Sequence, residues 1–157
     1  EMWYRHNFGH DGPLQYHGLG TNAKMSELQA AMGLSVLPYI DNIIQERREI
    51  GNIYEDAFHN TPISTLKIRK DTAWNGAYFP VIFPTHQELI KAEAALKQVD
   101  ILPRRYFAPS LEDLPYIDNL TCGIAADIAG RVLCLPLYKG IAEASVLKIS
   151  QLIKRNI

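Results

Sequence analysis

The sequence predicts an α+β fold: a small sheet with helices packed on one face. Two extended, largely apolar segments at 64–70 and 76–83 follow each other directly and predict a pair of strands. An amphipathic helical pattern at 86–99 separates this pair from a third extended segment at 101–107. With helical patterns before and after these segments, the expected order is α-α-β-β-α-β-α-α, which is typical of a sheet covered by helices.

The composition is that of a soluble, globular protein with a real core. The chain has 157 residues, of which 47% are hydrophobic, and a chain of this size can bury a core of its own. The formal net charge of −1 argues against a nucleic-acid partner, and no apolar run approaches the length of a membrane span. Cys122 and Cys134 have neither metal-binding nor Cys-x-x-Cys spacing, so we expect a reducing, cytoplasmic location.

The first helical pattern covers 22–36 and follows an irregular, aromatic lead-in at 1–19. The second begins at Pro38, a residue suited to the first turn of a helix. Arg47 falls on the apolar side of this second helix and needs a partner there. The apolar positions recur at three- and four-residue steps, as expected for an amphipathic helix: Ile40, Ile43, Ile44, Ile50, Tyr54 and Phe58.

In the second half of the chain, the segment 122–137 is expected to form a helix that stops before Pro136. The closing helix is expected at 143–156. Pro80 lies inside the second predicted strand and has no amide hydrogen, so we expect it at a sheet edge or a bulge. The domain division that follows is an interface arm and helix over 1–36 and an α+β domain over 37–157.

The stretch GLGTNAKM has the features of an anion site. A helix start carries unpaired N–H groups and partial positive charge. Gly18 and Gly20 would let a phosphate approach the backbone, and the side chains that can donate to it are Thr21, Asn22 and Lys24. The same residues also fit an ordinary helix cap after a glycine turn. From the residues alone both interpretations stay open.

Three histidines, His6, His10 and His17, lie in the lead-in without cysteines or carboxylates at metal spacing, so the sequence predicts no metal site. His10, in GHDG, is placed to approach a substrate.

Arg104 and Arg105 lie in the third extended segment, 101–107, where one of them can bind a nucleotide phosphate through two hydrogen bonds. The alternative is a structural pair with one buried and one solvated side chain. Tyr106 and Tyr138 fit packing residues with a polar tip.

The segment GTNAKMSELQAAMGL resembles a Gly-x-Asn-x-(Arg/Lys)-Met-x-Glu-Leu-x-Ala-Ala-x-Gly-Leu motif. That motif belongs to the DegT/DnrJ/StrS-type sugar-nucleotide aminotransferases, which are fold-type I pyridoxal phosphate (PLP) enzymes. NFGHDG resembles the arm that follows the PLP-lysine region in this family, and RRYFAP the Tyr/Pro stretch that lines the sugar site. AGRVLCLPLYKGI resembles the Leu-Pro-Leu-Tyr motif before the final helix, so the resemblance covers nearly the whole chain.

This resemblance implies the fold of the family's C-terminal small domain, with the helix leading into it. It also implies PLP as cofactor, with Asn22 donating to the PLP phosphate of a neighbouring subunit in a homo-oligomer. The implied cofactor-binding residues are Gly20, Thr21, Asn22 and Lys24, and the implied substrate-binding residues are His10, Arg104, Arg105 and Tyr106. The implied substrates are a nucleotide-linked keto sugar and an amino donor, with glutamate expected. GTNAKM and YFPVIF are most similar to members that act on 3-keto deoxysugar nucleotides.

In the family, the Schiff-base lysine, the Asp that pairs with the pyridine nitrogen and the aromatic side chain that stacks on the ring lie upstream of the matched region. We therefore expect this chain alone to hold no catalytic residue and to be inactive. The alternatives are a non-catalytic dimerisation or regulatory module and a stand-alone domain that binds a nucleotide at the glycine corner. Ser110 and Leu111 stand where many members carry a histidine, so the resemblance leaves the sugar unspecified, and polysaccharide biosynthesis is the family's usual destination.

Overall fold

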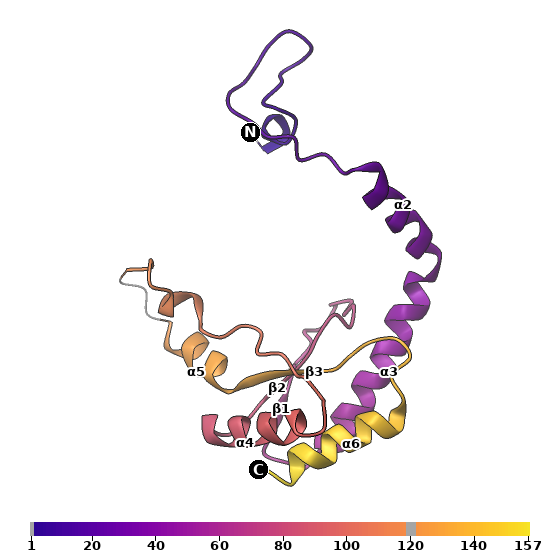
Figure 1. The fold of residues 1–157 in the computed structure, drawn as a ribbon, viewed down its shortest axis with the longest axis vertical. Coiled ribbons are helices and arrows are strands. Elements are labelled where there is room, and N and C mark those ends of the chain that lie inside the picture. The colour runs from indigo at the N-terminus through magenta and orange to yellow at the C-terminus, as the bar shows by residue number, and fades with distance from the viewer. Residues whose placement is uncertain (1, 119–121) are drawn as a thin grey trace. The chain divides into compact units, whose positions relative to one another are not determined.

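The computed structural model describes residues 2–118 and 122–157. The chain divides into two compact units, Glu1–Asp41 and Asn42–Ile157. The second unit holds the sheet and most of the helices (Figure 1).

The sheet of the second unit has three antiparallel strands in the order β1-β2-β3. They are β1 (Ser64–Thr65), β2 (Phe79–Ile82) and β3 (Val132–Leu135). Val81 in the central strand lies opposite Thr65 on one side and Leu133 on the other. A small antiparallel sheet with helices confirms the predicted α+β class.

The helices of this unit are α3 (Ile40–Phe58), α4 (His86–Lys97), α5 (Gly123–Arg131) and α6 (Glu143–Lys154), with a short 3₁₀ helix at Leu111–Asp113. The predicted helices at 86–99 and 143–156 are confirmed. The first of them begins where Thr85 caps it, because the Thr85 hydroxyl accepts a hydrogen bond from the Glu88 amide. Figure 1 shows α4 and α6 side by side on the same side of the sheet.

The core lies between this side of the sheet and the helices. Because side chains alternate along a strand, Phe79 and Val81 share one face of β2, and Leu133 and Leu135 share the matching face of β3. Their burial against helical side chains removes apolar surface from water, which is the main favourable term in folding. The helical residues of this core include Ile50, Tyr54, Phe58, Leu89, Leu96, Val146, Ile149 and Ile153.

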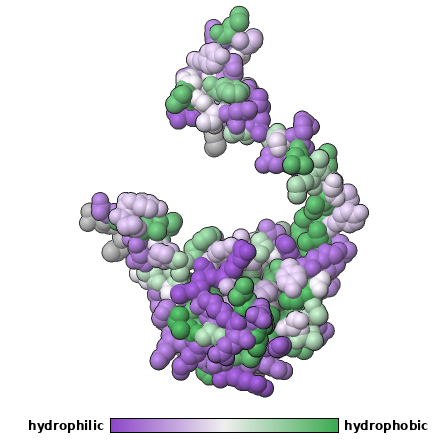
Figure 2. All heavy atoms as spheres, in the orientation of Figure 1, coloured by the Kyte–Doolittle hydropathy of each residue, from purple (hydrophilic) through white to green (hydrophobic). Residues whose placement is uncertain are grey.

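The first unit contains α1 (Met2–Arg5), α2 (Glu27–Val36) and a 3₁₀ helix at Leu37–Tyr39. Ser26 and Gln29 form a capping box at the start of α2. No residue of α2 is buried, and Leu28, Met32 and Leu34 are exposed by 64 to 73%. Hydrophobic atoms are accordingly visible along this part of the chain in Figure 2.

The expected helix at 22–36 is therefore shorter than predicted, because it begins at Glu27. Asn22 instead lies in extended backbone, in an antiparallel bridge with Asn7. Ser26 has the extended backbone and the side-chain acceptor that a cap requires, so it sets the start of the helix. The second predicted helix begins as a 3₁₀ turn that contains Pro38 and continues as α3.

The third strand is not where the sequence predicted it. In 101–107, only Arg104 forms a bridge, with Cys134, and β3 comes from the segment 122–137 that was predicted to be helical throughout. All four residues of β3 are buried, so the strand is a continuous apolar run without alternation. Such a run cannot be distinguished from a buried helix by its periodicity.

Pro80 lies in the central strand, so the expectation of a sheet edge is wrong. Both backbone groups of Cys134, which faces Pro80, are bonded to Arg104 on the far side of β3. Pro80 is therefore at a position that makes no hydrogen bond to β3. On the other side of β2, strand β1 pairs with Ile82 and Val81 but not with Pro80. The missing amide hydrogen of Pro80 therefore removes no hydrogen bond between strands.

The segment before β2 is attached to α3 by the two neighbouring arginines. Arg48 donates from Nε and Nη2 to the Trp74 carbonyl, at 3.0 and 2.8 Å. Gly76 has φ +63°, and a Cβ there would lie 2.8 Å from the Cβ of Arg47. The sequence led us to expect a partner for Arg47. Its Nε, however, is buried and makes no hydrogen bond among the described residues.

Candidate functional site

The glycine corner of the first unit is built by backbone pairing between the end of α1 with the turn that follows it and the segment 21–23. The Thr21 amide donates to the Arg5 carbonyl at 2.8 Å, and the Phe8 amide donates to the Thr21 carbonyl at 3.0 Å. The Ala23 amide donates to the His6 carbonyl at 2.8 Å. The corner therefore has a defined shape, but no helix begins at Asn22, so the expected helix N-terminus is not available to an anion there.

Another part of the chain approaches Gly20 so closely that only glycine fits there, which the sequence did not indicate. A Cβ at this position would lie 2.2 Å from the Gly9 nitrogen and 2.6 Å from the Phe8 carbonyl carbon. Gly9 has φ +82°, and a Cβ there would lie 1.8 Å from the Gly18 oxygen. The space that we expected Gly20 to leave for a phosphate is thus filled by the chain itself, whereas Gly18 has nothing within 4 Å of its Cβ position.

Beside this corner lies a hollow of about 510 Å³. We call it the arm hollow, and it is lined by His6, Asn7, Phe8, His10, Gly12, Pro13 and Lys24. The Lys24 ammonium is 5.5 Å from the centroid of the Phe8 ring. The His10 ring packs against Tyr16, with 4.5 Å between the centroids, and meets the edge of Phe8. Among the residues that the structure describes, no carboxylate lines the hollow.

Two of the sequence-predicted site residues, His10 and Lys24, are brought together in the arm hollow, while Gly20, Thr21 and Asn22 do not line it. His6 and Asn7 were not predicted. They reach the hollow because 6–8 pairs with 21–23, and long-range pairing of this kind leaves no local signal in the sequence.

The other predicted substrate residues lie in the second unit and separate into two environments. Arg104 is exposed, donates to the Tyr106 hydroxyl and lies 5.4 Å from the centroid of that ring. The Tyr106 ring in turn meets Tyr78 edge-on, with 5.3 Å between the centroids. Arg104 and Tyr78 also line a cavity of about 620 Å³.

Arg105 is half-buried and has a structural task. Its Nη2 donates to the Ala129 and Gly130 carbonyls at the end of α5, at 3.3 and 3.2 Å. This matches the alternative of one solvated and one structural arginine. Its Nε and the Ser110 hydroxyl are buried without hydrogen-bond partners within the described part of the chain.

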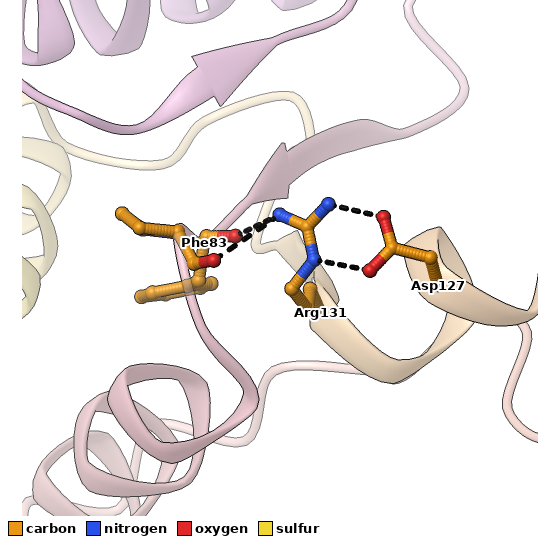
Figure 3. A network of polar contacts seen from close by, with 4 residues as sticks. Phe83, Asp127 and Arg131 are labelled. Carbon is orange, nitrogen blue, oxygen red and sulfur yellow. Dashed lines mark hydrogen bonds and ion pairs between the residues drawn. The ribbon is translucent and has the colours of Figure 1, made fainter. Parts of the chain in front are cut away.

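An ion pair fixes the junction between α5 and β3, as Figure 3 shows. Arg131 donates from Nε to Asp127 at 2.9 Å and from Nη2 to the other carboxylate oxygen, while its Nη1 donates to the Phe83 carbonyl at 2.5 Å. The hydrogen bond from Arg131 lowers the pKa of Asp127. Arg131 thereby joins the end of α5 to the end of β2.

Within residues 2–118 and 122–157, no group of three or more His, Cys, Asp or Glu side chains is placed to hold a metal ion. No helix in this part of the chain combines the length and the apolar character that a membrane crossing requires.

Comparison with known proteins identifies relatives along almost the entire chain. The profile of the DegT/DnrJ/EryC1/StrS aminotransferase family matches residues 2–154. The dTDP-4-amino-4,6-dideoxy-D-glucose transaminase of Escherichia coli is 35% identical over 94% of this chain. The match covers 42% of that enzyme, so this chain spans about two fifths of its length.

Solved structures give the same result for the fold. DesI, crystallised with its TDP-sugar product, superposes with a TM-score of 0.86 and 27% identity, over 98% of this chain and 41% of its own. Spr1654 from Streptococcus pneumoniae, solved in its PLP form, superposes with a TM-score of 0.74 over 99% of this chain and 43% of its own. At 18% identity, the second likeness shows the fold alone.

Proposed function

This chain belongs to the DegT/DnrJ/EryC1/StrS aminotransferase family, and on that premise we propose that it is the C-terminal part of a PLP-dependent sugar-nucleotide aminotransferase. The complete enzyme transfers an amino group, from glutamate as the donor, to a keto sugar nucleotide. The observation that carries the proposal is a family match over nearly all of this chain and only two fifths of its relatives. The E. coli relative is named as a transaminase of a dTDP-sugar, and DesI was crystallised with a TDP-sugar.

In this proposal the glycine corner supplies side-chain donors to the phosphate of PLP. Thr21, Asn22 and Lys24 carry donors, and their backbone is held in place by pairing with 5–8. When PLP is bound in such an enzyme, it supplies the electron sink for amino transfer. In this proposal Asn22 donates to a phosphate oxygen of a neighbouring subunit's PLP and Lys24 adds positive charge, with Gly20 and Thr21 shaping the corner.

For the sugar nucleotide, the residues proposed are His10 in the first unit and, separately, Arg104, Arg105 and Tyr106 in the second unit. Arg104 is the side chain best placed to bind a phosphate, because it is exposed and a guanidinium has five N–H donors. Arg105 contributes by holding the wall of the site against α5, because its Nη2 is bonded to carbonyls there. The lysine that holds PLP lies outside these residues, so the 157-residue chain by itself is inactive.

Asn22→Ala in the complete protein tests the cofactor role. Loss of one donor to a buried phosphate is expected to weaken PLP binding by about 1–3 kcal/mol. PLP affinity is measured by equilibrium dialysis, with the exposed Asn52→Ala as the matched control. An unchanged affinity in Asn22→Ala removes Asn22 from this role.

Amino transfer from glutamate to a dTDP-linked keto sugar tests the enzyme itself, with the complete protein and the 157-residue chain assayed side by side. Activity of the short chain alone would contradict the placement of the PLP lysine. A complete protein that dimerises but neither retains PLP nor transfers an amino group would instead be a non-catalytic dimerisation or regulatory module.

A further inference from the structure

The cavity of about 620 Å³ lies entirely within the second unit. We call it the edge cavity, because one of its walls is the segment 99–104, which meets the outer edge of β3 through Arg104. Another wall is formed by Ser145, Lys148 and Ile149 of α6. Their spacing of three and four residues places these three side chains on one face of the helix. The cavity is therefore made by segments that are distant in sequence.

Backbone hydrogen bonds hold the segment 99–104 in place. The Ile101 amide donates to the Leu96 carbonyl in the last turn of α4, at 3.0 Å. Arg104 and Cys134 exchange two backbone hydrogen bonds, at 2.7 and 3.1 Å. The wall is thus attached both to α4 and to β3, and the shape of the edge cavity is set by the fold of the unit.

The lining of the edge cavity is mostly apolar. Leu135 and Ile149 belong to the core, with 4% and 2% of their surface exposed, and Ile101, Leu137 and Ile141 pack against that core. A sugar hydroxyl placed against these side chains would lose its water partners and gain no hydrogen bond, whereas an apolar group would gain from leaving water. The volume lies in the range of pockets that hold small molecules, which are mostly apolar with a few polar groups. The cavity therefore favours a ligand with an apolar body.

The charged lining favours an anionic group on that body. Arg104 and Lys148 are cations, and Asp100 is the one carboxylate among the described residues that line the cavity. The Arg104 guanidinium already donates to the Tyr106 hydroxyl. The exposed Lys148 ammonium forms no ion pair or hydrogen bond within the described part of the chain, so it is the cation that the cavity offers to a ligand. Ser145 is three residues before it on the same helix face and carries a hydroxyl donor.

We propose that the edge cavity is a binding site for a small amphipathic carboxylate. The apolar body of the ligand lies against Leu135, Leu137 and Ile149, and its carboxylate accepts hydrogen bonds from Lys148 and Ser145. This site goes beyond the proposed function, because neither a sugar nucleotide nor glutamate has an apolar body of the kind that this lining selects. The ligand is therefore a third molecule, bound in addition to the two substrates.

Isothermal titration calorimetry tests the proposal with three probes of equal shape: 4-phenylbutyrate, its neutral amide 4-phenylbutyramide, and the cation 4-phenylbutylamine. The complete protein and the 157-residue chain are titrated in parallel. We expect the acid to bind to both proteins and the amide to bind about tenfold more weakly, because the amide lacks the charge-assisted bond to Lys148.

The variant Lys148→Met locates the site. It should weaken binding of the acid about tenfold and leave binding of the amide unchanged, because only the acid uses the ammonium. Lys154→Met removes the same charge from an exposed position at the end of the same helix, outside the cavity lining, and should change neither. Both lysines are exposed, so neither change disturbs the core.

Four results would overturn the proposal. Equal binding of acid and amide, or of acid by the parent and Lys148→Met, would mean an unspecific apolar contact. Tighter binding of the amine would assign the cavity to cations through Asp100. Binding to the short chain but not to the complete protein would show that the rest of the enzyme covers the cavity. Displacement of the acid by dTDP would make the cavity part of the substrate's site. None of the four contradicts the proposed function, which is tested by amino transfer and PLP retention in the complete protein.

Discussion

Tyr54 shows how one side chain can connect the helices to the sheet. Its ring is completely buried and stacks on Phe79, with 5.0 Å between the centroids, and its hydroxyl donates to the Pro136 carbonyl at 3.0 Å. Burial raises the pKa of Tyr54 well above its usual range, and the nearby Tyr138 adds to the effect. The buried hydroxyl therefore keeps its proton in the folded state.

We predict that the folded protein loses stability in alkali because of Tyr54. A tyrosine in the unfolded chain ionises near pH 10, whereas Tyr54 in the folded chain ionises at higher pH. The stability that this group contributes is complete below about pH 10 and is lost as the pH rises towards the folded pKa. Denaturant unfolding at several pH values between about pH 8 and about pH 11 measures this loss of stability. Tyr54→Phe should flatten this pH dependence, and an unchanged slope in that variant would contradict the assignment.

Asp127 has the opposite dependence. The hydrogen bond from Arg131 lowers the pKa of the Asp127 carboxyl, so the ion pair is present above the pKa of an unfolded aspartate and is lost as the pH falls through the lowered folded value. Arg131→Met should move the pKa of Asp127 back towards the usual aspartate range. A ¹³C titration of the carboxyl carbon measures the shift, and Arg155→Met, at the exposed C-terminus of α6, is the control. Equal pKa values in Arg131→Met and the parent chain would show that Arg131 does not stabilise the carboxylate.

At the scale of elements, α3 and the segment before β2 pack closely against each other. The Trp74 ring lies directly on Gly51, where a Cβ would be 2.9 Å from the ring edge, and Arg48 holds the Trp74 carbonyl. Gly51 is therefore needed in α3 although glycine is a poor helix former, because the contact leaves no room for a side chain. The hydrophobic periodicity of α3 predicts the helix but not this contact.

We predict that Gly51→Ala destabilises the second unit by about 1–3 kcal/mol, the usual cost of overpacking a well-packed site. Gly130→Ala in α5 is the matched control, because nothing lies within 4 Å of its Cβ position. That change should be neutral or gain roughly 0.5–1 kcal/mol from the better helix propensity of alanine. Chemical denaturation of both variants measures the difference, and equal stabilities would mean that Trp74 moves aside without cost.

At the scale of the whole molecule, the most unusual feature is the exposure of α2. The helix carries the exposed apolar side chains of Leu28, Met32, Leu34 and Val36 and buries no residue within the described chain. Monomeric proteins rarely expose a contiguous apolar surface of this kind. We therefore expect α2 to be covered in an assembly, in keeping with the homo-oligomer proposed for the enzyme.

The 157-residue chain is accordingly predicted to self-associate in sedimentation velocity experiments. Leu28→Lys with Leu34→Lys should shift it towards monomer, because a charge in an apolar contact is costly to bury. Leu147→Lys, at an exposed position in α6, adds the same kind of charge elsewhere and should leave association unchanged. A monodisperse monomer of the parent chain would contradict the prediction.

Much of the fold follows from local patterns. The helices α4 and α6 and the extent of α3 are encoded in apolar spacing and capping residues, and β2 in an apolar run, so they could be predicted without tertiary information. The motif at 20–34 and the three shorter motifs indicated the family, and the family profile matches residues 2–154. The third strand was misplaced because β3 is buried on both faces and has no period of its own, and 101–107 offers only Arg104 to the sheet.

For the candidate site, the sequence by itself determined which residue types are present: a glycine corner with Thr21, Asn22 and Lys24, and the arginine pair. Only the tertiary structure decided which of these residues lie close together. Backbone pairing brought His6 and Asn7 beside Lys24 and made Gly20 a point of close chain crossing, and the helix begins only at Glu27, after the cap at Ser26. The physical reason is the distance in sequence over which each interaction acts. Apolar periodicity and helix caps act within a few residues. A hollow is formed by segments that are distant in sequence and meet only in the folded chain.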